Sequence, residues 1–333
     1  MRLGDPVLED PFTWRGLTFR NRSGIAAGFD KNAVCLQGLE RLGAGFVEVG
    51  TILVEPWAGN PVSPRMARLL KLHGLWNRLG FTSLGLGRVE KNLARFPRER
   101  RRGMIVACNI GPHPGNLKRA SSRTEALAIA QTELMRLTEA LFPHTDMFVI
   151  NLSSPNTPGL RSLLQSAELT EVVIEPIRRQ LGRQDEVSGR RWRTLLLIKL
   201  PPEDENRELW TEQLLSKVIQ PLLTADACDG FVAVNTSARL ALEHFKAEPT
   251  DLPGGVSGEP LRNEALRMVG LMRRLIGPDK LLIGCGGIMI PEHANLFRSA
   301  GADLVEMYSG LVFAGPGLVS GCAKAMGEII AEQ

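Results

Sequence analysis

The stretch Leu195-Leu-Leu-Ile-Lys-Leu-Pro201 decides the fold class of this chain, because it is apolar at almost every position. Near-continuous apolarity, without alternation of polar and apolar residues, is typical of a parallel β-strand buried on both faces. Seven other short runs share this character, at residues 24–28, 46–50, 104–109, 147–151, 230–235, 281–284 and 304–308. The pattern therefore predicts eight buried strands.

Helical patterns lie between most of these runs, at residues 125–141, 169–181, 208–223, 263–275 and 291–300. The last of them begins with a proline, which favours the first position of a helix. Eight strands that alternate with helices are the count of a (β/α)8 TIM barrel, an α/β fold. A doubly wound open sheet is the alternative, but no G-x-G-x-x-G fingerprint follows the first strand. We expect one barrel domain over residues 1–333, with segment 238–260 as an elaborated loop over its C-terminal mouth.

The composition is that of an ordinary globular protein, with 44% hydrophobic and 23% charged residues. Forty basic and 36 acidic residues leave a net charge of +4. The basic runs at 98–102 and 190–193 each precede a strand, so we interpret them as solvated loops rather than as nucleic-acid or membrane surfaces. A single tyrosine also disfavours stacking platforms for single-stranded nucleic acid. We therefore expect no nucleic-acid partner.

Five cysteines, at positions 35, 108, 228, 285 and 322, show no C-x-x-C spacing, which indicates reduced, buried thiols. Residues 1–11 are polar, so no signal peptide is expected. The longest uncharged stretch, 307–323, is interrupted by Gly and Pro and is too broken for a membrane span. These features predict a cytoplasmic protein with at most peripheral contact with the cytoplasmic face of the membrane.

Two lysines stand out as candidate functional cations. Lys199 has only apolar neighbours in its strand, and lysine is almost never buried without a partner. It either stabilises a bound anion or developing negative charge, or it extends to solvent at the strand end. Lys31 follows Gly28 on a Gly-rich loop and has the same two interpretations, with pairing to Asp30 as the structural one.

Five asparagines lie at strand ends or in the loops that follow them, at positions 77, 109, 151, 156 and 235. Each alone could be a turn residue. Together they suggest a site lined with amides, which suits a heterocycle with alternating N–H and C=O groups. Gly286-Gly287 and Ser309-Gly310 follow strands seven and eight, where many barrels bind phosphate. The five histidines are scattered without ligand spacing and no G-x-S-x-G elbow is present, so metal and hydrolase sites are disfavoured.

These segments resemble, in order, those of class 2, quinone-linked dihydroorotate dehydrogenases over roughly residues 12–320. The most specific is Asn151-Leu-Ser-Ser-Pro-Asn-Thr-Pro-Gly-Leu-Arg161. The others are Gly24-Ile-Ala-Ala-Gly-Phe-Asp-Lys-Asn32, Phe46-Val-Glu-Val-Gly-Thr51, Gly59-Asn-Pro61 with Pro64-Arg65, Asn77-Arg-Leu-Gly-Phe81, Gly254-Gly-Val-Ser-Gly-Glu-Pro-Leu-Arg262, Gly284-Cys-Gly-Gly-Ile288, and Tyr308-Ser-Gly310 with Gly315-Pro-Gly-Leu318.

The resemblance implies an FMN-containing barrel that oxidises dihydroorotate to orotate in pyrimidine biosynthesis. Ser154 would be the base that takes the C5 proton while the C6 hydride passes to flavin N5. The sister class carries Cys at that place, so Ser selects class 2. A serine hydroxyl is a poor base at neutral pH and must pass its proton onward, through water or a neighbouring hydroxyl such as that of Thr157.

The resemblance also implies the rest of the site. Substrate would be bound by Lys31, Asn77, Phe81, Asn151, Asn156, Asn235 and Thr236. FMN would be bound by Ala27, Gly28, Lys31, Thr51, Asn109, Asn151, Lys199, Asn235, Gly258, Gly287, Tyr308, Ser309 and Gly310, with Lys199 near the ring. Arg65 and Tyr308 resemble the residues between flavin and quinone.

The chain departs from the family pattern in three places. It starts about a dozen residues before the matching core, so we expect the N-terminal helical pair that binds the membrane and forms the quinone tunnel to be missing. Asn109-Ile-Gly-Pro-His113 replaces Asn-Ile-Gly-Lys-Asn. Ala33 replaces a glycine, and residues 70–76 differ from the usual segment. The electron acceptor therefore stays open, with quinone favoured.

Two alternatives to dihydroorotate oxidation remain at this level. One is a paralogous FMN oxidoreductase that acts on another carboxylated cyclic amide. The other is a catalytically idle flavin-binding protein, although the joint presence of Ser154, Lys31 and Lys199 argues against it. The oligomeric state stays open.

Overall fold

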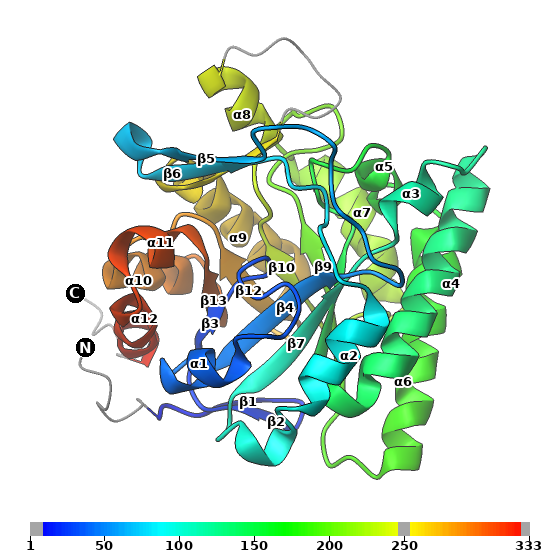
Figure 1. Cartoon of the computed structure of the whole chain (residues 1–333), viewed down its shortest axis with the longest axis horizontal. Coiled ribbons are helices and arrows are strands. Elements are labelled where there is room, and N and C mark those ends of the chain that lie inside the picture. The colour runs from blue at the N-terminus through cyan, green and yellow to red at the C-terminus, as the bar shows by residue number, and fades with distance from the viewer. Residues whose placement is uncertain (1–8, 246–253, 328–333) are drawn as a thin grey trace.

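The computed structural model describes residues 9–245 and 254–327 (Figure 1). Eight parallel strands close into a barrel, which confirms the predicted fold class. In order around the barrel they are β3 (Ser23–Ile25), β4 (Phe46–Ile52), β7 (Ile105–Ile110), β8 (Met147–Asn151), β9 (Leu195–Leu200), β10 (Gly230–Ala233), β12 (Leu281–Cys285) and β13 (Leu304–Met307), with β13 pairing to β3. Each overlaps one of the eight apolar runs, although β3 shares only Gly24 and Ile25 with the run predicted at 24–28.

Helices surround the barrel (Figure 1). They are α1 (Leu36–Arg41), α2 (Leu86–Ala94), α3 (Pro114–Leu117), α4 (Arg123–Leu141), α5 (Leu160–Leu164), α6 (Glu175–Ser188), α7 (Glu212–Thr224), α8 (Ala238–Phe245), α9 (Arg262–Ile276), α10 (Pro291–Ser299), α11 (Ser309–Ala314) and α12 (Gly317–Gly327). Short 3₁₀ turns lie at Leu70–Leu72, Arg98–Arg100, Phe142–His144 and Glu259–Leu261. None of the helices within residues 9–245 and 254–327 combines the length and apolarity needed to cross a bilayer.

Three of the five expected helices, α4, α9 and α10, begin and end within two residues of their predicted bounds. The helix predicted at 169–181 ends later than expected, and the one predicted at 208–223 begins later. The segment predicted at 169–181 starts as a π-helical turn, Thr170–Ile174, before α6 continues to Ser188. Helix α7 begins only at Glu212, because the Thr211 side chain caps it by accepting a hydrogen bond from the Leu214 N–H at 3.2 Å.

The described part of segment 238–260 is more regular than a loop. It contains helix α8 and strand β11 (Gly255–Gly258), which pairs antiparallel with β6 (Gly74–Asn77), and β6 pairs with β5 (Met66–Leu69). Residues 246–253 of this segment lie outside the described residues. Figure 1 shows β5 and β6 at the opposite end of the barrel from the first hairpin. This small sheet covers the C-terminal mouth.

The N-terminal end of the barrel is closed by a hairpin of β1 (Phe12–Trp14) and β2 (Leu17–Phe19). Leu17 and Phe19 are fully buried against the inward-facing residues of the barrel strands. The Phe19 ring meets the Phe46 ring edge-on, with 5.9 Å between ring centroids. Apolar side chains thus seal this end, and the cavity of the molecule lies at the other.

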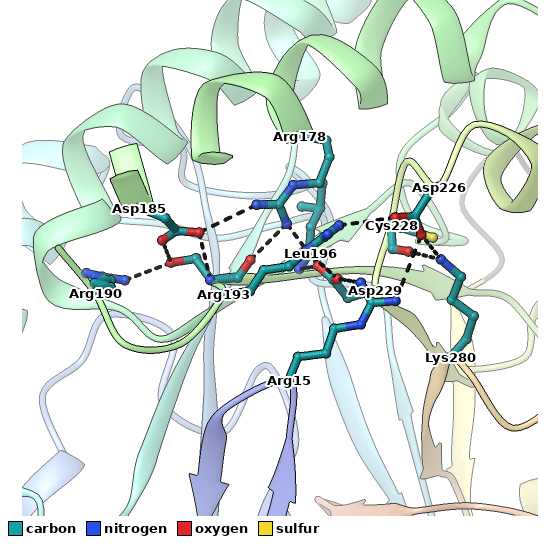
Figure 2. Close-up of polar contacts among 11 residues, drawn as sticks. Arg15, Arg178, Asp185, Arg190, Arg193, Leu196, Asp226, Cys228, Asp229 and Lys280 are labelled. Atoms are coloured by element: carbon teal, nitrogen blue, oxygen red, sulfur yellow. Dashed lines mark hydrogen bonds and ion pairs between the residues drawn. The ribbon is translucent and has the colours of Figure 1, made fainter. Parts of the chain in front are cut away.

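A charged network ties the hairpin to the barrel (Figure 2). The fully buried Asp229 pairs with Arg15 at 2.6 Å, Arg193 at 2.8 Å and Arg178 at 2.9 Å. Its carboxylate also accepts from the Leu196 N–H at 2.9 Å. The basic run at 190–193 therefore has structural partners, and it is not a freely solvated loop.

The run at 98–102 is also partly structural. Arg101 is 2% exposed and donates to the Asp146 carboxylate at 3.1 Å, contrary to the solvated-loop interpretation. The cysteine prediction needs a similar correction. Three cysteines are buried, but Cys35 is exposed and Cys285 is partly exposed.

Candidate active site

The interior of the barrel is built in layers that follow the two-residue period of its strands. Inward-facing apolar residues, such as Phe46, Leu197 and Leu304, fill the lower layers. Two positions further along six of the eight strands, the inward residue becomes polar or ionisable. This polar layer consists of Glu48, Asn109, Asn151, Lys199, Cys285 and Glu306, and the apolar core therefore ends where the candidate site begins.

Above the polar layer lies a cavity of about 1050 Å³ at the C-terminal ends of the strands. All the site residues expected from the sequence line it except Asn109 and Arg65: Ala27, Gly28, Lys31, Thr51, Asn77, Phe81, Asn151, Ser154, Asn156, Lys199, Asn235, Thr236, Gly258, Gly287, Tyr308, Ser309 and Gly310. Residues separated by more than 280 positions in the sequence thus meet around one cavity.

Two adjacent serines after β8 have different surroundings. The Ser153 hydroxyl donates to Asn151 Oδ1 at 2.8 Å and accepts from Asn235 Nδ2 at 2.9 Å. The Ser154 hydroxyl lies at the cavity and accepts only from the Asn156 N–H, at 3.2 Å, among the contacts of the described residues. Ser154 is therefore the hydroxyl of this pair that is placed to meet a ligand.

Asn109 is fully buried beneath the cavity, and it connects the amides above it to the charged residues below. Its Oδ1 accepts from the Thr51 hydroxyl at 2.6 Å and from Asn151 Nδ2 at 3.2 Å. Its Nδ2 donates to Glu48. Asn109 therefore fixes the orientation of Thr51 and Asn151, and any effect on a ligand is exerted through them.

Asn156 presents an unsatisfied acceptor. Its Nδ2 makes long contacts of 3.4 Å to both oxygens of Asn77, whereas its Oδ1 is buried with no partner among the described residues. Buried amide oxygens are rarely left without a donor, because the lost hydration is not replaced. Asn156 therefore supplies a position for a ligand N–H.

Lys31 is the cation of the cavity that has no carboxylate partner among the described residues. Burial lowers the pKa of Lys31 to about 8. The structural interpretation, a pair with Asp30, is not supported, because the Asp30 carboxylate accepts instead from the N–H groups of Val34 and Cys35 at 2.9 and 2.7 Å. Lys31 is thus available to an anionic ligand.

Lys199 differs, because it is already paired. Its Nζ lies 2.8 Å from Glu306 and 3.2 Å from Glu48, and all three side chains are buried. Burial alone would lower the pKa of Lys199, but the two carboxyl groups outweigh burial and raise it. The interpretation of Lys199 as a lysine extending to solvent is therefore wrong.

The pKa values of Glu48 and Glu306 are shifted in opposite directions. Burial, followed by the charge of Glu306, raises the pKa of Glu48 well above its usual range. Burial would also raise the pKa of Glu306, but Lys199 and the contact with Glu48 hold it below that range. Sequence reasoning assigned no role to either acid. The sequence does contain a sign that these acids face the barrel interior. Each lies inside a buried strand, two positions after an inward-facing apolar residue, Phe46 or Leu304.

The far end of the cavity is lined by backbone. Helix α11 begins at Ser309, and the first N–H groups of a helix have no acceptor within it. The Ser309 hydroxyl lies 2.8 Å from that of Ser257. Gly258 has φ of +87°, and a Cβ there would lie 2.5 Å from the His73 carbonyl oxygen, so β11 can approach this end only with glycine. Such an arrangement of N–H and O–H donors suits a phosphate.

Arg65 and Tyr308 are not brought together around the cavity. Tyr308 lines it and meets the Phe29 ring edge-on, with centroids 5.6 Å apart. Arg65 is exposed beside the small sheet and donates to the Ala58 carbonyl at 2.6 Å.

The chain is similar to known proteins over almost its whole length. The family model for dihydroorotate dehydrogenase matches residues 12–330. The chain is 38% identical to a protein of Paracidovorax citrulli named dihydroorotate dehydrogenase (quinone), over 96% of this chain and 86% of that protein. It is 39% identical to one of the same name from a Nocardioides species, over 95% and 87%. The crystal structure of the Eimeria tenella enzyme in complex with ferulenol is similar, with a TM-score of 0.79 and 31% identity over 96% of this chain and 84% of that one.

Proposed function

The chain belongs to the dihydroorotate dehydrogenase family, and from that premise we propose that it holds FMN in the cavity, uses Ser154 as the base and passes electrons to a quinone. Its reaction is the oxidation of dihydroorotate to orotate in pyrimidine biosynthesis. The observation that carries the proposal is that the Ser154 hydroxyl, the unpaired Lys31 and the unsatisfied Asn156 Oδ1 share one cavity. A base, a cation and an acceptor are what a cyclic amide carboxylate requires.

The donor groups that line the cavity fit FMN. The backbone at Gly258, Gly287, Ser309 and Gly310, with Tyr308, would hold the phosphate and ribityl chain. Ala27, Gly28, Thr51 and Lys199 would border the ring, and Asn109 would act through Thr51. When bound, the flavin supplies the hydride acceptor, and the protein supplies position and charge.

The substrate would lie between Lys31 and the amides. Lys31 would bind the carboxylate and also contact the flavin. The ring would meet Asn77, Asn151, Asn156, Asn235, Thr236 and Phe81, which all line the cavity. Asn151 Oδ1 and Asn235 Nδ2 are held by Ser153, so these amides are oriented before a ligand arrives.

Ser154 would remove the C5 proton. Because its hydroxyl is a weak base, the proton must leave through a neighbour. The Thr157 hydroxyl is buried with no partner among the described residues, which supports it as the next acceptor.

We also assign the whole chain, residues 1–333, to one FMN-binding domain, since the described residues form a single barrel. The quinone assignment is supported by the names of the relatives, and Arg65 and Tyr308 would stand between flavin and quinone.

The test is anaerobic addition of dihydroorotate to the purified, flavin-loaded protein while the flavin absorbance is recorded. We expect rapid bleaching, and recovery of the yellow colour when a ubiquinone analogue is added but not when fumarate or NAD is added. Protein that stays yellow would contradict the substrate assignment. Recovery with fumarate or NAD alone would contradict the quinone.

A further inference from the structure

The floor of the cavity contains more acid than Lys199 needs. Two carboxyl groups contact one ammonium group: Lys199 Nζ lies 3.2 Å from Glu48 Oε2 and 2.8 Å from Glu306 Oε1. Glu306 Oε2 is buried with no donor among the described residues. Two ionised carboxylates on one ammonium group would leave a net negative charge at a buried place, which is costly, and a proton on one of the acids removes that charge.

Around the pair, the described residues supply neutral donors but no second cation in contact with the acids. The neighbour from β7 is the neutral Asn109, which donates to Glu48. The neighbour from β12 is Cys285, whose pKa is raised by burial and by Glu306, so it stays a neutral thiol. Lys31 lines the same cavity from the loop after β3, but no contact between it and the acids is present among the described residues.

We propose that Glu48 and Glu306 hold a single proton between them, so that the pair cancels the charge of Lys199 and leaves the cavity floor electrically neutral toward the flavin. This inference rests on the proposed function in one respect, namely that a flavin lies against this floor. Glu306 and Glu48 are then positioning residues that act through Lys199. Without the two acids, the ammonium group of Lys199 would stabilise the negative charge that the flavin gains on reduction. The singly protonated acid pair cancels this stabilisation.

The shared proton makes a distinctive prediction for variants. In Glu48→Gln or Glu306→Gln, the remaining acid gives up the proton and still balances Lys199, so the floor stays neutral. In the double variant, nothing balances Lys199. The measurement is the equilibrium constant for reduction of the bound flavin by a reference dye. We expect each single variant to stay within about twofold of the parent, and the double variant to favour the reduced flavin at least about tenfold, equal to about 30 mV for two electrons.

Two results of this measurement would overturn the proposal. If each single variant shifts the equilibrium in the same direction by about half of the change in the double variant, both acids are ionised in the native protein. If the double variant shows no shift, Lys199 is not the charge that the pair cancels.

Infrared spectroscopy tests the proton itself, on protein with or without flavin. We expect the native protein at pH 7 to show a C=O band of a protonated carboxyl that moves in D₂O. The band should vanish in both single variants and persist in Glu40→Gln, which removes a buried acid paired with Arg20 elsewhere. A native protein without such a band would refute the shared proton even if no variant folds. Protein that never binds flavin would contradict the proposed function and leave this test in force.

Discussion

The side-chain amide of Asn235 donates to the hydroxyl of Ser153 at 2.9 Å, and this contact separates two serines that the sequence presents as equals. Ser153 is engaged on both sides by amides, whereas its neighbour Ser154 opens on the cavity. The relationship also ties the end of β10 to the loop after β8. The loop that carries Ser154, our proposed base, is thus tied through Ser153 to two of the amides that we propose orient the substrate.

Replacement of Ser154 by alanine should abolish most of the proton removal and leave the flavin bound. We expect the rate of anaerobic flavin bleaching by dihydroorotate to fall by about 10²–10⁴-fold, the range typical of a lost general base. Stopped-flow absorbance measures it. Ser153→Ala is the matched control and should lose at most about thirtyfold, because only two orienting contacts of about 1 kcal/mol each are removed. If the two variants were equally slow, the assignment of the base to Ser154 would be wrong.

Orotate binding should weaken at alkaline pH. Burial lowers the pKa of Lys31 to about 8, so the cation is present below that pH and is lost as the pH rises through it. We expect the dissociation constant for orotate, followed by the flavin spectrum, to be level below pH 8 and to rise about tenfold per pH unit above it. In Lys31→Arg the guanidinium keeps its charge, and the constant should stay level, although weaker binding overall is expected. A native constant that is unchanged from pH 7 to 10 would contradict this role.

Asn156→Ala should weaken binding of the substrate and leave binding of the cofactor unchanged. The variant removes the buried Oδ1 that has no partner among the described residues. We expect orotate affinity to fall about tenfold, corresponding to one lost hydrogen bond in a dry site, with unchanged FMN content. Asn263→Ala, at an exposed position at the start of α9, serves as the control. Loss of FMN together with orotate affinity would show that Asn156 supports the cavity as a whole.

The ion pairs of Asp229 should contribute to the free energy of unfolding, although they lie outside the candidate active site. Asp229→Asn would leave Arg15, Arg178 and Arg193 with too little negative charge at a fully buried position. We expect the free energy of unfolding in urea to fall by about 3–5 kcal/mol. Glu243→Gln, which removes a 57% exposed acid paired with the partly exposed Arg239, should cost less than about 1 kcal/mol. Equal losses in the two variants would mean that burial of Asp229 is not the reason for its effect.

Several features were determined by the sequence alone. The eight strands could be located because a strand covered on both faces must be apolar almost throughout, and this is visible in a window of six residues. The polar residues after those strands could be assigned to one site, because the C-terminal ends of parallel strands in a closed barrel meet at one end.

Other features depended on contacts between residues distant in the chain. The sequence could not show whether the charge of Lys199 has a partner, because its partners, Glu48 and Glu306, come from the distant strands β4 and β13. The pairing of β11 with β6 likewise joins segments about 180 residues apart, so segment 238–260 showed no local sign of a sheet. Composition and periodicity report which face of an element is buried. Only the closed barrel decides which side chains share that buried space, and therefore which charges cancel and which remain for a ligand.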